Sequence, residues 1–178
     1  EFMTQMVGET YTDPGVIVKI GDEDSEPDDI SGTVDINTPG VYTITYSKVN
    51  EDGYSASAQR YVGIIDPSAL ENDFTGEYQR TLYGTNSTPA GFAVWTKIAD
   101  GLYTNNNVGG VDGRPEYIYE VYVFNVTDDK LIVPKQPNAL GGIINCTSTS
   151  GGSASDLIDF IEGPVGTESY MWSVKGAG

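Results

Sequence analysis

The sequence lacks histidine, contains a single cysteine, and carries only nine lysine and arginine residues in 178 positions. Without histidine, a Ser–His–Asp triad, a histidine general base and a histidine-ligated zinc site are all excluded. The lone Cys146 cannot form an intramolecular disulfide or a thiolate metal cluster, so we expect it to be a small buried residue. No apolar run approaches the ~18 residues that a membrane-spanning helix needs.

Negative charge dominates the chain. It has 26 Asp and Glu residues, and its formal net charge is −17. A field of this sign repels the phosphates of nucleic acids and the headgroups of anionic membranes, so neither is an expected partner. The simplest interpretation of the acidity is the solubility of an exported protein, and calcium binding is the alternative.

Residues that favour turns and strands are abundant. The chain contains 22 Gly, nine Pro and 12 Tyr residues. Glycine and proline break the chain into short segments, whereas tyrosine, valine, isoleucine and threonine favour strands. We therefore predict an all-β protein, and the length suits either one large domain or two small ones.

The first third of the chain alternates between strand and turn patterns. Val16–Ile20, Thr33–Ile36 and Val41–Tyr46 read as strands, and the chain returns through residues 55–65. Asn50-Glu51-Asp52-Gly53 is typical of a hairpin loop, because Asp-Gly supplies a positive-φ position. The acidic run of residues 22–29 cannot pack against apolar side chains, and we expect it to be a solvated loop.

Period-two alternation assigns the faces of the two longest strands. Tyr42, Ile44 and Tyr46 are predicted to point to one side of the sheet, and Val41, Thr43 and Thr45 to the other. On the returning strand one face holds Ala56, Ala58, Arg60, Val62 and Ile64. Arg60 is expected near the edge of the buried zone on that face.

Four sequence elements occur in order, namely residues 7–15, 34–46, 50–53 and 58–62, and they read "VGETYTDPG", "VDINTPGVYTITY", "NEDG" and "AQRYV". Together they resemble the bacterial Ig-like domains of the DUF5011 type over residues 6–66. The resemblance implies an Ig-like β-sandwich in residues 1–68, in an extracytoplasmic protein, without the disulfide of antibody domains. The strand that usually precedes these elements is expected to be missing or cut off.

The chain begins with Glu1-Phe2-Met3, which reads like a cloning scar before an internal fragment. A leader peptide or a lipid anchor upstream is compatible with such a start. The family resemblance implies an extracytoplasmic location, as an outer-membrane lipoprotein at the cell surface.

Residues 69–178 are predicted to form a second, antiparallel β domain, either a barrel or a sandwich. Turn signals separate eight candidate strands, at Gly76–Tyr83, Ala90–Ile98, Leu102–Asn105, Tyr117–Val126, Lys130–Val133, Gly142–Thr147, Asp156–Glu162 and Ser169–Lys175. In the fourth candidate strand neither face is purely polar, so both faces are expected to be covered over part of its length. A helical turn is the alternative for residues 156–162.

The start of this segment, residues 74–80, resembles the first strand of lipocalin-like modules in exported Bacteroidota proteins. DUF5011-type or DUF5012-type domains followed by such a module are familiar in outer-membrane lipoproteins of gut Bacteroidota. These lipoproteins are often encoded near glycan-uptake machinery. The resemblance therefore implies a glycan as the ligand.

Aromatic side chains are the first candidate ligand-binding feature. Tyrosine and tryptophan stack on sugar rings because they offer flat apolar area with a polar handle. The candidates for an exposed platform are Trp95, Tyr103, Tyr83 and Trp172, with residues 105–107, all asparagine, as hydroxyl partners. The alternative interpretation is that these aromatics are ordinary core residues.

Carboxylates are the second candidate feature. Asp22, Asp24 and Asp28 are weak calcium candidates, because the acidic run lacks the central glycine and terminal glutamate of an EF-hand. For glycoside hydrolysis, Glu116 and Glu120 would lie ~13 Å apart on one strand face, which is too far for a catalytic pair. Asp112 would have to fold back from beyond a turn to complete one. No catalytic residue and no cofactor is predicted.

These observations favour a non-catalytic module at the cell surface that binds or presents a glycan or another extracellular ligand. The expected partners are a polysaccharide or another surface protein, and nucleic acid is excluded. A structural spacer without a small ligand is the first alternative. A carboxylate-based enzyme that acts on glycans is the second.

Overall fold

The computed structural model describes residues 1–79, 92–107, 120–137, 143–147, 157–163 and 169–173. Over these residues the fold is all-β, as predicted, and a single 3₁₀ helix is its one helical element. None of the described helical segments is long and apolar enough to cross a membrane.

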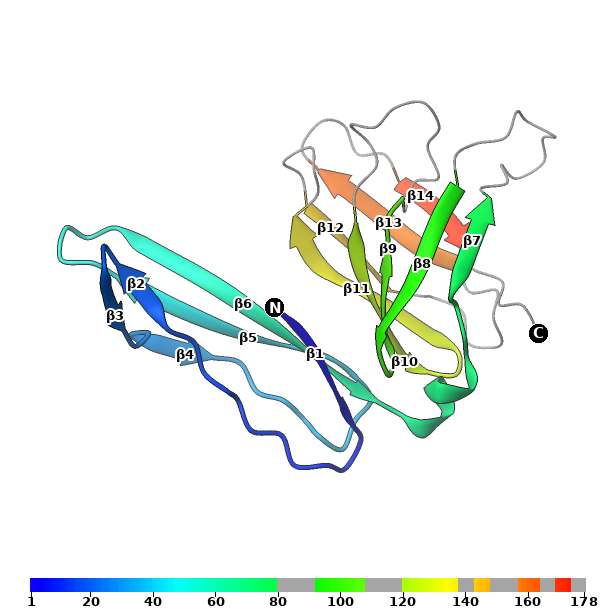
Figure 1. Cartoon of the computed structure of the whole chain (residues 1–178), viewed down its shortest axis with the longest axis horizontal. Helices are drawn as coiled ribbons and strands as arrows, with labels where there is room; N and C mark the ends of the chain where they lie inside the picture. The colour runs from blue at the N-terminus through cyan, green and yellow to red at the C-terminus, as the bar shows by residue number, and fades with distance from the viewer. Residues whose placement is uncertain (80–91, 108–119, 138–142, 148–156, 164–168, 174–178) are drawn as a thin grey trace.

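The first sheet has four strands in the order β1-β6-β5-β4. They span Phe2–Met6 (β1), Ser55–Ile65 (β6), Gly40–Val49 (β5) and Asp29–Ser31 (β4). β1 runs parallel to β6, whereas β5 is antiparallel to both of its neighbours. The predicted hairpin at Asn50–Gly53 joins β5 to β6, and the positive φ of Gly53 makes its turn. Figure 1 shows this sheet extending to one side of the molecule.

The inner face of this sheet carries its core, as the alternation predicted. Ile44, Tyr46, Val62 and Ile64 are buried there, and Tyr42 packs against them. The opposing layer consists mainly of extended segments that contribute Tyr11, Val16 and Val34. Strands β2 (Val18–Ile20) and β3 (Glu23–Ser25) form a separate two-stranded sheet in that layer.

Three expectations for this part are wrong in detail. The acidic run is exposed but contains β3 and the start of β4, because Gly21 turns the chain and Lys19 pairs with Asp24 across the resulting hairpin. Residues 33–36 are not a strand, since Gly32 takes a left-handed φ of 104° and Asp35 accepts hydrogen bonds that form a turn. The strand expected to be missing is present as β1.

The second sheet has eight strands in chain order, β7 to β14, each antiparallel to its neighbours. They are β7 (Gly76–Gln79), β8 (Phe92–Ala99), β9 (Leu102–Asn105), β10 (Val121–Thr127), β11 (Lys130–Pro137), β12 (Ile143–Thr147), β13 (Leu157–Gly163) and β14 (Ser169–Ser173). Each of the eight predicted strands is confirmed over its described residues, including the strand in place of a helical turn at residues 157–163. Such a meander is the strand order of up-and-down barrels, although the described residues include no pairing between β7 and β14.

A short 3₁₀ helix, η1 (Pro67–Glu71), connects the two sheets. Asp66 caps it by accepting a hydrogen bond from the backbone N–H of Ser68, and Pro67 suits the first helical position. The connection is tied to the second sheet, because Asn72 donates to Asn125 and Asp128 donates its N–H to Ser68. The first sheet thus ends at Ile65 and the second begins at Gly76. The division into domains at residue 68 stays a prediction.

Arg60 lies on the inner face of β6 and is 3% exposed; it is the first buried residue after the exposed residues 55–59, so its predicted place near the edge of the buried zone is confirmed. Its guanidinium donates to Asp13, to Glu1 and to the carbonyl oxygen of Gly15. The Tyr46 hydroxyl donates to the same Asp13 carboxylate at 2.7 Å. A buried charge needs such partners to offset its lost hydration, and this network ties the segment around Asp13 to β5 and β6.

Replacing Asp13 with Asn should lower the free energy of unfolding by about 2 kcal/mol, because Arg60 loses a charged partner within the core. Urea denaturation at neutral pH measures the change. Asp24→Asn is the matched control, since its ion pair with Lys19 is 60–70% exposed and should contribute nothing measurable. Equal effects of the two substitutions would contradict the importance of the Arg60 network.

Protonation of Asp13 should also lower the stability of the folded protein in acid. Burial alone would raise its pKa, but hydrogen bonds from Tyr46 and Gly15 and the charge of Arg60 together hold that pKa below its ordinary value of 3.8. A lowered folded-state pKa contributes stability above the ordinary pKa that is lost as pH falls through the folded one. Urea melts from pH 7 to pH ~2 should show a smaller acid loss for Asp13→Asn than for the original protein; identical pH profiles would refute this assignment.

Candidate functional site

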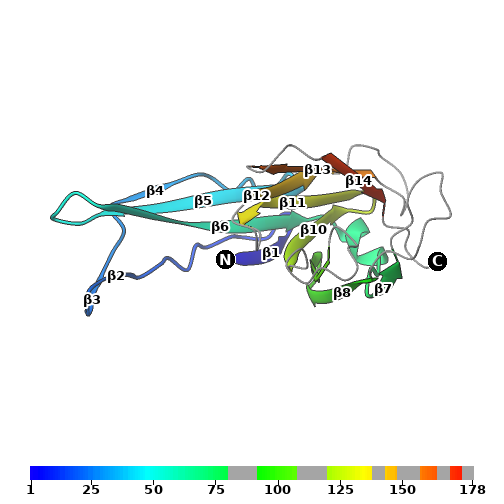
Figure 2. The ribbon, with the colours of Figure 1, turned by 90° about the horizontal axis from the view of Figure 1, so that it is seen from above.

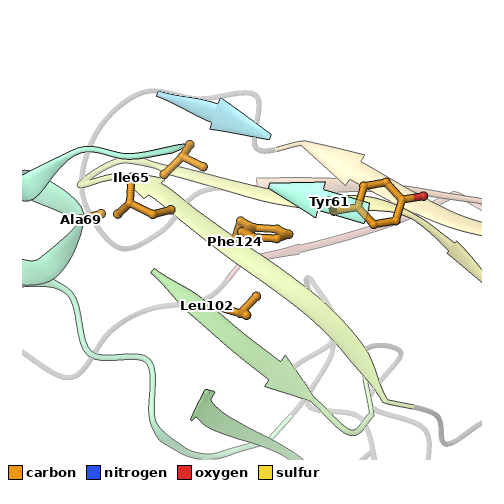
Figure 3. Packing of buried hydrophobic residues seen from close by; sticks show 6 residues of the cluster. Tyr61, Ile65, Ala69, Leu102 and Phe124 are labelled. Atoms are coloured by element: carbon orange, nitrogen blue, oxygen red, sulfur yellow. The ribbon is translucent and has the colours of Figure 1, made fainter. Parts of the chain in front are cut away.

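The most extensive feature of the described structure is the contact between the two sheets. It consists of the outer face of β6 and strands β9 and β10, with η1 at its end. Its buried residues are Tyr61, Ile65, Ala69, Leu102, Phe124 and Val126. Figure 2 shows β10 and β11 beside the end of β6, and Figure 3 shows the labelled side chains of this cluster between the strands. The two sheets therefore share one hydrophobic core.

Glycines bring the two sheets into close contact. A Cβ on Gly63 would lie 2.3 Å from Cδ1 of the Phe124 ring, and one on Gly101 would lie 2.7 Å from Cδ1 of Ile65. Each glycine therefore leaves room for a large side chain of the opposite sheet. The ring of Phe2 on β1 stacks on Tyr122 of β10, with centroids 4.0 Å apart.

Polar contacts seal the edges of this contact. The Tyr61 hydroxyl donates to the backbone carbonyl of Lys135, and the backbone N–H of Asp66 donates to the carbonyl of Val126 at 2.8 Å. Burial raises the pKa of the Tyr61 phenol, so it stays protonated and able to donate. In both bonds the donor belongs to the first sheet or to the connection, and the acceptor belongs to the second sheet. Because a hydrogen bond requires a favourable angle as well as a short distance, these bonds restrict how one sheet is oriented relative to the other.

β10 is buried on both faces, as its sequence predicted. Tyr122, Phe124 and Val126 point toward the first sheet, whereas Val121 and Val123 point the other way. Tyr103 is paired with Val123 across β9 and β10 and so lies on that second face, where its ring is edge-on to Phe74 with centroids 5.5 Å apart. The interior of the described part of the meander is therefore filled by side chains.

The predicted aromatic platform does not form from Trp95 and Tyr103. Trp95 is 2% and Tyr103 is 1% exposed, so the expectation that they face solvent is wrong. The physical reason is strand parity, since both lie on the interior face with Val121 and Val123. Tyr83 lies outside the described residues, and the side chain of Trp172 on β14 is likewise not described.

The side chains of the asparagine run, residues 105–107, form hydrogen bonds with nearby backbone groups. Asn105 and Asn107 are buried, and the Asn105 side chain accepts from the N–H of Asn107. The Asn106 side chain accepts from the N–H of Val94, and its own N–H donates to the Val94 carbonyl. These contacts complete the edge between β8 and β9. No ligand is needed to account for them.

The calcium candidates are dispersed. Asp24 pairs with Lys19, and Asp28 pairs with Lys48 and accepts from the N–H of Val49. Within the described part of the chain, no three acidic or cysteine side chains form a group that could hold a metal ion. Of the predicted enzyme carboxylates, Glu120 is exposed, while Asp112 and Glu116 lie outside the described residues. Cys146 is on β12, where side chains are not described.

With this geometry in place, comparison with known proteins finds a family to which the first part of the chain is similar. Residues 1–64 match the family model described as "Bacterial surface protein, Ig-like domain". The match covers the sequence from β1 to the end of the first sheet, so the predicted Ig-like module is confirmed. The narrower DUF5011-type assignment and the DUF5012-type and lipocalin-like resemblances stay predictions.

Among solved structures, the chain is similar to a lipoprotein from Bacteroides thetaiotaomicron. The sequence identity is 22%, the alignment covers 98% of this chain and 95% of that one, and the TM-score is 0.41. That TM-score is too low to establish a common overall fold. No curated protein matches the sequence.

One residue of the sequence, Gly63, indicates the contact between the sheets, although the alternation of polar and apolar residues does not reveal it. Gly63 interrupts an apolar strand, and glycine inside a strand often marks a close approach of another element. Its partner Phe124 is 61 residues further along the chain. The identity of such a distant partner cannot be read from strand periodicity.

Substituting Gly63 with Ala should destabilise the protein by about 1–3 kcal/mol, because the new methyl group overlaps the Phe124 ring. Gly40→Ala is the matched control on β5: its Cβ would lie 3.7 Å from the nearest atom of the Tyr42 ring, an ordinary contact, so its effect should be small. Thermal denaturation compares the two. In a Phe124→Leu background the cost of Gly63→Ala should shrink, and an unchanged cost would show that the two residues are not coupled.

Proposed function

We propose that this chain is a non-catalytic, extracytoplasmic surface module in which the Ig-like part holds the β meander in a fixed orientation. The observation that carries the proposal is the hydrophobic core shared by β6 and β10. Two parts joined by a flexible linker move relative to one another unless their interface is large and apolar. Here the connecting helix and the interface are both packed and hydrogen-bonded.

The surface location is supported by the family that residues 1–64 match, since its members are described as bacterial surface proteins. The strong negative charge suits an exported protein as well. Attachment to an outer membrane through a lipid anchor belongs to the same proposal, and it rests on the sequence resemblance alone.

Presentation of a domain fits the described residues better than a glycan platform. Trp95 and Tyr103 fill the interior and cannot stack on a sugar ring. Glycan binding is therefore a more specific proposal. It depends on the side chains of Tyr83 and Trp172 or on other residues that the structure does not describe. An enzymatic role would need the carboxylates Asp112 and Glu116 to meet in a cleft.

The proposal predicts that both sheets tumble as one body. ¹⁵N relaxation of backbone amides should give the same rotational correlation time for β5 and β6 as for β9 and β10, because the shared core prevents independent motion. Gly63→Ala should loosen the contact and separate the two values, whereas Gly40→Ala should leave them equal. Two distinct correlation times in the original protein would refute the proposal.

A further inference from the structure

The hairpin of β2 and β3 has little support from the rest of the fold. We call residues 17–27 the acidic hairpin; its two strands pair with each other and the chain turns at Gly21. Among the described strands, neither β2 nor β3 makes an extended contact with any third strand. Figure 2 shows the hairpin directed away from β4, β5 and β6. An isolated two-stranded hairpin is only marginally stable in water, so this is the part of the sheet layer that moves most easily.

Both ends of the acidic hairpin are fixed to the first sheet. At the start, Val16 packs against the core of that sheet. At the end, the backbone N–H of Asp28 donates to the carbonyl of Ser47 at 2.8 Å, and the Asp28 carboxylate pairs with Lys48. Residues 17–27 therefore have one simple motion available, which is a swing toward the sheet or away from it about the line between Val16 and Asp28.

The acidic hairpin and the sheet each present apolar side chains toward the other. Val18 and Ile20 share one face of β2, and Lys19 lies on the other. Val18 is partly buried whereas Lys19 is exposed, so the face of Val18 and Ile20 is the one directed at the sheet. On the inner face of the sheet, Ile30 lies beside Tyr46. Ile20 is 42% and Ile30 is 55% exposed, so both would lose apolar surface to water if the hairpin swung inward.

Electrostatic repulsion opposes this swing. The acidic hairpin holds four carboxylates and one lysine, and the end of the sheet that it faces, residues 28–31 and 47–54, holds the same numbers. Glu23 is aligned with Ile20 across the hairpin, so its carboxylate is on the face directed at the sheet. Like charges repel over the Debye length, which is ~30 Å at 0.01 M salt and ~8 Å at 0.15 M. Apolar burial thus draws the hairpin inward, and a repulsion that salt can screen holds it away.

We propose that the acidic hairpin is a flap whose position is set by the ionic strength around the protein. In dilute salt the repulsion keeps the flap open and Ile30 exposed. As salt screens the carboxylates, the flap closes about Val16 and Asp28 and brings Val18 and Ile20 onto the inner face at Ile30. The flap is separate from the core shared by the two sheets, so failure of one proposal leaves the other intact.

Solvent paramagnetic relaxation measures the opening directly. A neutral gadolinium chelate is added to the full chain with ¹³C-labelled isoleucine and valine methyl groups. Between ~20 mM and ~500 mM NaCl the relaxation enhancement of Ile20 and Ile30 should fall about 2-fold, because closure excludes the chelate from both. Val49 on the outer face of β5 and Ile98 on β8 are internal controls, since they are 52% and 53% exposed and do not face the flap. No fall at Ile20 and Ile30, or an equal fall at all four residues, would overturn the proposal.

Two charge variants separate the flap from the net charge of the protein. Glu23→Gln removes a carboxylate from the flap face, so the enhancement of Ile20 and Ile30 should already be low at ~20 mM NaCl. Glu71→Gln removes the same charge from an exposed position on η1 and should behave like the original protein. Equal responses of the two variants would show that net charge acts without the flap.

A third variant tests the apolar contact. Ile30→Ser leaves every charge in place but removes the surface on which the flap closes, so the salt dependence of Ile20 should disappear. An unchanged salt dependence of Ile20 in this variant would contradict closure onto Ile30. The series is repeated at a tenfold lower protein concentration. A loss of the salt effect on dilution would assign it to association between copies and would also overturn the flap.

Discussion

Strand β6 is buried on both faces over its last residues, and the arrangement of the two sheets depends on this. Val62 and Ile64 complete the core of the first sheet, while Tyr61 and Ile65 belong to the core shared with the second. Gly63 lies between them on the shared face and leaves the space that the Phe124 ring fills. Because one strand supplies both cores, movement of the second sheet would disturb the packing of the first.

The same strand changes character along its length. Its second half is buried, whereas residues 55–59 are exposed, and Arg60 lies at the transition. Arg60 is held there by Asp13, so a charge inside the core connects the sheet to the segment that covers it. Beyond that point the cover ends, the apolar inner face opens, and acidic side chains surround it.

Alternation predicted a large share of the fold. The strands of the second sheet and the hairpin at Asn50–Gly53 follow from turn signals, and the faces of β5 and β6 follow from alternation, because a strand with one buried face must alternate. Local errors arose where side chains bond to nearby backbone. Asp35 is the example, since its turn interrupts a run that otherwise alternates like a strand.

The sequence by itself determined the all-β class and the exclusion of histidine and cysteine chemistry, because composition and period-two patterns act locally along the chain. The Ig-like character of the first part came from the resemblance of its four sequence elements to a known family. Only the tertiary structure decided that Trp95 and Tyr103 are interior residues and that Phe124 meets Gly63. Alternation shows that a strand has two faces. Which face is covered, and by what, depends on segments that are distant in the chain.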